Sequence, residues 1–139
     1  MEGKSLADMK VGDSASFTKT ISEADVYAFA GITGDFNPVH INREYAEGTI
    51  FKGRIAHGAL AAGLVSAVLG MQLPGAGAIY VSQSLRFTKP VYFGDTITAS
   101  AEVVELIADR NRVRLATRCT NQHGEVVAEG ESVLSPKKS

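Results

Sequence analysis

The sequence predicts an α+β fold in which an antiparallel sheet is wrapped around a long buried central helix. Residues 57–70 contain no Asp, Glu, Lys or Arg and are apolar or small on every side, the pattern of a helix buried all round. After residue 78 apolar positions recur every second residue, the period of strands that bury one face. Such a sheet needs an apolar layer against its inner face, and this helix is the segment that can supply it.

The composition fits one domain over residues 1–139. Hydrophobic residues make up 45% and charged residues 21%, which allows a packed core. The net charge of −1 gives no reason to expect nucleic-acid binding, and the single cysteine, Cys119, excludes an internal disulfide. The N-terminus lacks the pattern of a signal peptide, and no apolar run reaches the roughly 20 residues that span a bilayer. We therefore expect a cytoplasmic protein without a membrane or nucleic-acid partner.

The segments before the central helix are expected to be a strand, a helix and a long loop. Residues 14–20 are short and β-prone. Ser22 and Asp25 resemble a capping pair that begins a helix, and Gly31 and Gly34 are expected to end it. Residues 35–56 look irregular, with a short helical turn around 43–46, and ordered loops of this length are often functional.

The second half of the chain is expected to form four strands. Turn signals separate all four of them, at residues 94–95, 108–111 and 121–124, and successive strands with short turns predict an antiparallel sheet. In the first strand the apolar alternate positions, expected to face the core, are Ile79, Val81, Leu85 and Phe87. The strands are expected at residues 79–88, 96–103, 112–120 and about 125–134.

One run, GDFNPVH at residues 34–40, carries specific chemical information. With its neighbours (27–42) it closely resembles the signature of the MaoC-like, (R)-specific enoyl-CoA hydratases, also called hydratase 2. The runs GRIAHG (53–58) and FTKPVYFGD (87–95) resemble the same family, and the resemblance covers nearly the whole chain. Its length is similar to that of the short, single-domain bacterial members, such as those that feed polyhydroxyalkanoate synthesis. The resemblance implies a hot-dog fold, no cofactor, and a homodimer that binds acyl-CoA at the subunit interface.

The chemistry of hydration explains why Asp35 and His40 would be catalytic. Adding water across the C2–C3 double bond of an enoyl thioester needs a base for the water and a proton for the α-carbon. An Asp and a His that converge on one water can perform both transfers. Pro38 fixes its own φ and biases Asn37 away from helix. We therefore expect residues 35–40 to form a rigid, non-helical turn.

The third catalytic group implied by the resemblance is the backbone N–H of Gly58, which would hold the thioester oxygen. Gly58 lies at the predicted N-terminus of the central helix, where free N–H groups and the helix dipole favour negative charge. Helical spacing places Ser66 and Leu69 on the same face. By the same resemblance Ser66 would support the pair by hydrogen bonding, and Leu69 is a candidate wall of the acyl pocket.

Plainer interpretations stand beside several of these assignments. Asn37 either contacts substrate or only shapes the turn. His57 is either a substrate-binding residue or a residue that begins the helix and supports the site. Ser66 could simply bond the carbonyl one turn back. The arginines on one strand face either contact CoA phosphates or are solvated: Arg112, Arg114 and Arg118. Three histidines without a His/Cys cluster predict no metal site.

The leading hypothesis is reversible hydration of trans-2-enoyl-CoA to (R)-3-hydroxyacyl-CoA. A close alternative is a dehydratase of 3-hydroxyacyl-carrier-protein thioesters in fatty-acid synthesis, which the same site could serve. A hot-dog thioesterase would instead release free thiol. A non-catalytic acyl-CoA-binding subunit would bind without turnover, and such a subunit should lack a working Asp–His pair.

Overall fold

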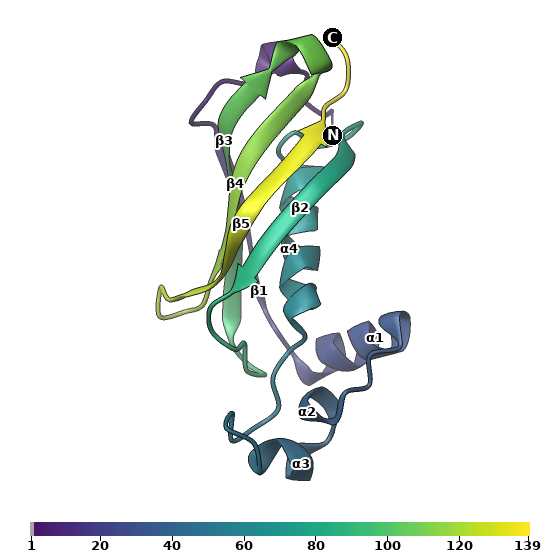
Figure 1. The fold of residues 1–139 in the computed structure, drawn as a ribbon, viewed down its shortest axis with the longest axis vertical. Coiled ribbons are helices and arrows are strands. Elements are labelled where there is room, and N and C mark those ends of the chain that lie inside the picture. Colours follow the sequence, from purple (N-terminus) through teal and green to yellow (C-terminus); the bar gives the residue numbers. More distant parts are fainter. Residues whose placement is uncertain (1) are drawn as a thin grey trace.

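The computed structural model describes residues 2–139 and consists of one antiparallel sheet with helix α4 (Gly58–Met71) against one of its faces (Figure 1). The strand order is β1-β3-β4-β5-β2, and every pair is antiparallel. The strands are β1 (Ser14–Thr20), β2 (Ile79–Phe87), β3 (Thr96–Ile107), β4 (Arg112–Thr120) and β5 (Val126–Ser135). This arrangement confirms the predicted α+β fold.

The core lies between α4 and the inner face of the sheet. Alternate residues of β3 and β4 are buried there, as their period-two pattern predicts. They pack against Leu64, Val65, Val68 and Leu69 of α4. Cys119 belongs to this core, and burial raises the pKa of its thiol to about 11, so the thiol is a packing group. The strand residues concerned are Ile97, Ala99, Ala101, Val103, Val113, Leu115 and Cys119.

Strand β2 differs most from its prediction. It pairs with β5 at the edge of the sheet, so the connection over residues 88–95 crosses from one side of the sheet to β3. Ile79 is 66% exposed, Val81 47% and Phe87 55%, so the expectation that these residues face the core is wrong for the protomer. An irregularity between Tyr80 and Ser82 also shifts the register.

Helix α4 is buried on one side only, which corrects the prediction of burial on every side. The face turned from the sheet carries small residues, among which Gly58, Ala59, Gly63 and Gly70 are exposed. Met71 at its end is 64% exposed. The sheet reaches round just part of the helix, so an apolar and small-residue surface continues from α4 onto β2.

Three short helices project beyond the N-terminal end of α4 (Figure 1). Helix α1 (Glu23–Thr33) begins at the predicted capping box of Ser22 and Asp25. It runs through Gly31 and ends at Gly34, whose φ of 84° is the left-handed conformation that glycine adopts readily. Helices α2 (Pro38–Ile41) and α3 (Arg43–Glu47) follow, the latter where a helical turn was expected.

Helix α2 corrects the prediction that the whole span 35–40 is non-helical. Proline is favoured at the first position of a helix because its missing N–H would be unpaired there. The Asn37 side chain accepts a hydrogen bond from the Val39 N–H at 3.2 Å and caps the helix. Two short 3₁₀ turns complete the chain, η1 (Leu6–Asp8) and η2 (Ala108–Arg110). Among residues 2–139 no helix has the length and apolarity that a membrane crossing requires.

Candidate active site

Asp35, His40 and His57 come together beside the N-terminus of α4. Each offers a side-chain oxygen or nitrogen, and these atoms lie within 4.8 Å of one another. Asp35 follows the end of α1, His40 lies on α2, and His57 immediately precedes α4. Asp35 is exposed, whereas His40 is 8% and His57 3% exposed. The structure therefore brings the predicted Asp–His pair together, with a second histidine behind it.

Local backbone hydrogen bonds set the position of Asp35. The Thr33 hydroxyl accepts a hydrogen bond from the Asp35 N–H at 3.1 Å. The Asp35 carboxylate accepts one from the Asn37 N–H at 3.2 Å, which closes a tight turn. The second carboxylate oxygen has no partner among residues 2–139. The turn thus fixes the carboxylate and leaves an oxygen free to act on a ligand.

The contacts of His40 assign its tautomer. Its Nδ1 lies 2.7 Å from the carbonyl oxygen of Ile55, and a carbonyl can only accept. Nδ1 therefore carries the proton, and in the neutral ring Nε2 is left as an acceptor. A ring nitrogen of His40 lies within 4.8 Å of the Asp35 carboxylate. An unprotonated Nε2 can serve as a general base that acts through a water.

His57 links the pair to the helix. Its Nε2 lies 2.9 Å from the backbone carbonyl oxygen of Asp35. Its ring stacks on that of His40, with centroids 3.8 Å apart and planes at 29°. The ring of Phe29 packs against the same imidazole, with the centroids 4.8 Å apart. Nδ1 of His57 is buried and has no hydrogen-bond partner within the described chain.

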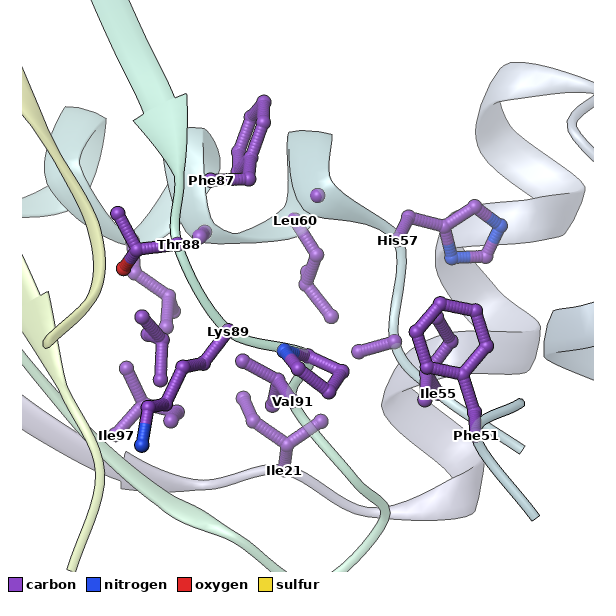
Figure 2. Close-up of a pocket in the computed structure, with 16 residues that line it drawn as sticks. Ile21, Phe51, Ile55, His57, Leu60, Phe87, Thr88, Lys89, Val91 and Ile97 are labelled. Carbon is purple, nitrogen blue, oxygen red and sulfur yellow. The ribbon is translucent and has the colours of Figure 1, made fainter. Parts of the chain in front are cut away.

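A mostly apolar cavity of about 440 Å³ begins at His57 and Gly58 and extends between α4 and the sheet. Figure 2 shows His57 at one end, Ile97 near the other, and Leu60 reaching into the space from α4. Lys89 and Thr88 are the polar side chains on the far side. The remaining walls are hydrocarbon, from Ile21, Phe51, Ile55, Ala56, Ala61, Leu64, Phe87, Pro90, Val91 and Val127.

The N-terminus of α4 supplies unpaired backbone donors at the mouth of this cavity. Leu60 N–H bonds the His57 carbonyl, but the N–H groups of Gly58 and Ala59 have no partner among residues 2–139. The ring of Phe87 lies over Gly58, so a Cβ at that position would come within 3.1–3.2 Å of it. The close contact explains why position 58 carries no side chain.

The Asp35–His40–His57 group also has the composition of a metal site. Two of its four ring nitrogens already contact carbonyl oxygens at 2.7 and 2.9 Å. The stacked rings direct their remaining lone pairs along neighbouring planes instead of toward a common point. Proton transfer suits this geometry better than metal ligation does, and a metal-free site stays a prediction.

Two residues expected at the site lie elsewhere in the protomer. Leu69 is 1% exposed and belongs to the core, so it does not line the cavity. Ser66 lines a shallow hollow between α4 and β2, about 12 Å along the helix from Gly58. Within the described residues it makes no hydrogen bond to Asp35 or His40. Sharing a helix face with Gly58 sets the direction of the Ser66 side chain around the helix axis. It does not set how far along the axis Ser66 lies.

A clamp that the sequence does not predict holds the short helices. Arg54, with 17% of its side chain exposed, pairs with Glu23 at 2.6 Å and donates to the Tyr27 hydroxyl at 2.6 Å. Its guanidinium also lies 4.6 Å from the Phe93 ring centroid. Tyr27 in turn donates to the Ile41 carbonyl on α2 at 3.3 Å. These residues come from separate segments, so no local pattern reveals the clamp.

The sheet around one helix is the hot-dog fold, and comparison with known proteins identifies the family. The family model described as a MaoC like domain matches residues 7–125. An (R)-specific enoyl-CoA hydratase of Rhodospirillum rubrum is 55% identical over 91% of this chain and 88% of its own. The chain belongs to the MaoC-like family.

Two further relatives are similar to this chain over most of its length. An R-hydratase of Pseudomonas aeruginosa, solved without ligand, has a TM-score of 0.94 and 44% identity over 99% of this chain and 88% of its own. A mitochondrial 3-hydroxyacyl-[acyl-carrier-protein] dehydratase of Arabidopsis thaliana is 37% identical over 89% of this chain and 75% of its own. The high TM-score confirms the predicted hot-dog fold.

Proposed function

We propose that this protein is an (R)-specific enoyl-CoA hydratase, which adds water reversibly to trans-2-enoyl-CoA to give (R)-3-hydroxyacyl-CoA. The observation that carries the proposal is the approach of Asp35 and His40 to within 4.8 Å beside the free N–H groups of α4. The identity of 55% to a protein named for this activity supports it.

One water between Asp35 and His40 is the reacting molecule. A water that bonds two acceptors at ordinary distances, with tetrahedral angles, holds them about 4.6 Å apart. A carboxylate oxygen of Asp35 and a ring nitrogen of His40 lie within 4.8 Å of each other, which allows such a water, and Nε2 is the His40 nitrogen left unprotonated. The two groups together take a proton from the water as its oxygen attacks C3 of the enoyl group, and return a proton to C2.

The electron pair of the double bond moves to the thioester oxygen as the C3–O bond forms. The Gly58 N–H, at the positive end of α4, donates to that oxygen. Protonation of C2 restores the thioester, and the reverse sequence removes water. Hydration and dehydration thus use the same three groups: Asp35, His40 and Gly58.

The cavity behind Gly58 takes the acyl chain in this proposal. Its walls are hydrocarbon, and burying methylene groups there contributes about 0.8 kcal/mol each. His57 lines the mouth of this cavity. The amide nitrogen of Asn37 has no partner within the described residues, which leaves it for a polar contact with the substrate.

We further propose that the working unit is a homodimer. The exposed apolar face of β2 and the uncovered small-residue face of α4 are neighbours, and a second copy of the chain would cover both. Strand β2 is also an edge of the sheet, and proteins usually pair or protect such edges. Ser66 lies on that face, so its proposed support of the catalytic pair needs the dimer.

A carrier-protein dehydratase is the second candidate, which the Arabidopsis relative favours. Both substrates present the same thioester to the site, and they differ in what lies outside it. Comparing kcat/KM for one acyl group carried on CoA and on acyl carrier protein decides between them. A large preference for the carrier protein would replace the CoA substrate in the proposal.

The direct test follows the ultraviolet absorbance of the conjugated enoyl thioester after the purified protein is added to crotonyl-CoA. We expect the absorbance to fall in wild type. A full absence of turnover with C4 to C12 enoyl-CoA substrates would refute the proposed function. We expect the protein in the cytoplasm, which fractionation of the source cells checks.

A further inference from the structure

His57 is the one buried titratable side chain at the site to which the proposed reaction gives no proton-transfer step. Its side chain is 3% exposed and makes two different contacts with the catalytic pair. It bonds the backbone of Asp35 through Nε2 and covers one face of the His40 ring. One side chain therefore contacts both groups that share the reacting water.

The partners of the two histidines assign both tautomers. The Asp35 carbonyl is an acceptor, so Nε2 of His57 carries the proton. The Ile55 carbonyl likewise places the His40 proton on Nδ1. The neutral rings thus have opposite tautomers, and each holds its proton in a bond to main-chain oxygen. His57 has no free proton near the reacting water, while the Nε2 of His40 remains a base.

The other nitrogen of His57 supports a positioning role. Nδ1 is buried without a partner among the described residues. A buried acceptor left unpaired costs about 1–3 kcal/mol, and such groups are rare in folded proteins. A residue there that served packing alone could be apolar and avoid this cost. The bond to Asp35 and the stack on His40 are the contacts that offset it.

The place of His57 in the chain adds a third link. It is the N-cap residue of α4, so its carbonyl carbon is bonded directly to the nitrogen of Gly58. Its side chain reaches Asp35, which comes 22 residues earlier. A shift of the short helices relative to α4 would therefore change the distance between the catalytic pair and the oxyanion donor.

We infer that His57 is a positioning residue that sets the Asp35–His40 pair against the Gly58 N–H. This inference rests on the proposed hydratase function. It assigns His57 no proton transfer, in contrast to His40. It predicts that changes at His57 lower kcat and leave KM close to its wild-type value, because substrate binding persists while the reacting groups lose alignment.

Three substitutions separate the two contacts of His57. His57→Gln places an amide N–H near the Nε2 position, whereas His57→Asn places it near Nδ1, one methylene short. His57→Phe keeps an aromatic ring for stacking and removes the donor. Each variant should lose about 10- to 100-fold in kcat, with Gln retaining more than Asn. His123→Gln, in an exposed turn, is the matched control and should keep wild-type rates.

Several results would overturn the inference. Wild-type kcat in all three variants would do so, as would Asn matching Gln or a loss confined to KM. A loss that follows the unfolded fraction, measured by circular dichroism, would reduce His57 to a purely structural residue. Inactive wild type would instead refute the proposed function, and then a second readout decides on His57.

That second readout is the tautomer pattern in long-range ¹H–¹⁵N spectra. With three histidines in the chain, the His123→Gln and His57→Gln variants assign the signals. The inference predicts Nε2–H for His57, Nδ1–H for His40, and a His40 ring signal that moves in His57→Gln more than in His57→Phe. An Nδ1–H tautomer at His57, or an unmoved His40 signal, would contradict it whatever the activity.

Discussion

The Nδ1 atom of His40 lies 2.7 Å from the carbonyl oxygen of Ile55, a residue that belongs to the segment leading into the central helix. The bond fixes the ring, assigns its proton to Nδ1 and leaves Nε2 as a base. The base thus owes its orientation to a main-chain atom 15 residues away in the sequence.

The first prediction concerns the catalytic pair. His40→Asn keeps a donor near the Nδ1 position and removes Nε2, and Asp35→Asn keeps the shape of the side chain and removes its charge. Each should lower kcat for crotonyl-CoA by about 10²–10⁴-fold, the usual contribution of a general acid or base. The circular dichroism spectrum should stay that of wild type. Full activity in either variant would remove that residue from the mechanism.

The second prediction isolates the Gly58 N–H. Gly58→Ala and Gly58→Pro both add a Cβ that meets the Phe87 ring, but only proline removes the N–H. Proline is tolerated at the first helical position, and His57, with φ −62° and ψ 137°, already has the backbone that proline demands of the residue before it. Pro should be about 10²–10³-fold slower than Ala in kcat. Equal rates would mean that the thioester oxygen is held elsewhere.

The third prediction concerns chain length. Leu60 lines the cavity and is partly buried, so its size can be changed without opening the core. Leu60→Phe should reduce kcat/KM for long enoyl-CoA substrates and leave crotonyl-CoA nearly unaffected, while Leu60→Ala should favour longer chains. Measuring both variants from C4 to C12 supplies an internal control. If kcat/KM depended on chain length in the same way in both variants, the acyl chain would lie outside this cavity.

The fourth prediction tests the dimer by sedimentation. Val81 lies on edge strand β2 and is 47% exposed, so Val81→Lys would place a charge in the proposed interface. It should shift the protein from dimer to monomer and lower activity with it. Val11→Lys changes a valine that is 62% exposed and precedes β1, at the opposite edge of the sheet from β2, and should remain dimeric. A monomeric wild type, or a dimeric Val81→Lys, would contradict the proposal.

The periodicity of the sequence predicts the elements well because each pattern reports on local burial. The strands at residues 112–120 and the capping box at Ser22 follow the structure closely. Strand order was beyond reach, because β2 crosses to pair with β5 through tertiary packing. Val81 shows the second limit. Its alternation predicts a buried face, and the protomer leaves that face uncovered.

The site was predictable in its parts and not in its assembly. The run GDFNPVH contains both Asp35 and His40, and its resemblance to the MaoC-like signature implies that they share a task. The stacking of His57 on His40, and the anchor at Ile55, arise from segments that meet only in the folded chain. Leu69 shows the converse limit, since helical spacing does not reveal that its side chain is buried in the core of the protomer.

The most direct test of the central claim is a coupled assay of the product's configuration. Crotonyl-CoA is incubated with the protein and with either an (R)- or an (S)-specific 3-hydroxyacyl-CoA dehydrogenase, and NADH formation is followed. The account predicts NADH with the (R)-specific enzyme, none above background with the (S)-specific enzyme, and a loss of about 10²–10⁴-fold in Asp35→Asn. NADH with the (S)-specific enzyme alone, or no product with either, would contradict it.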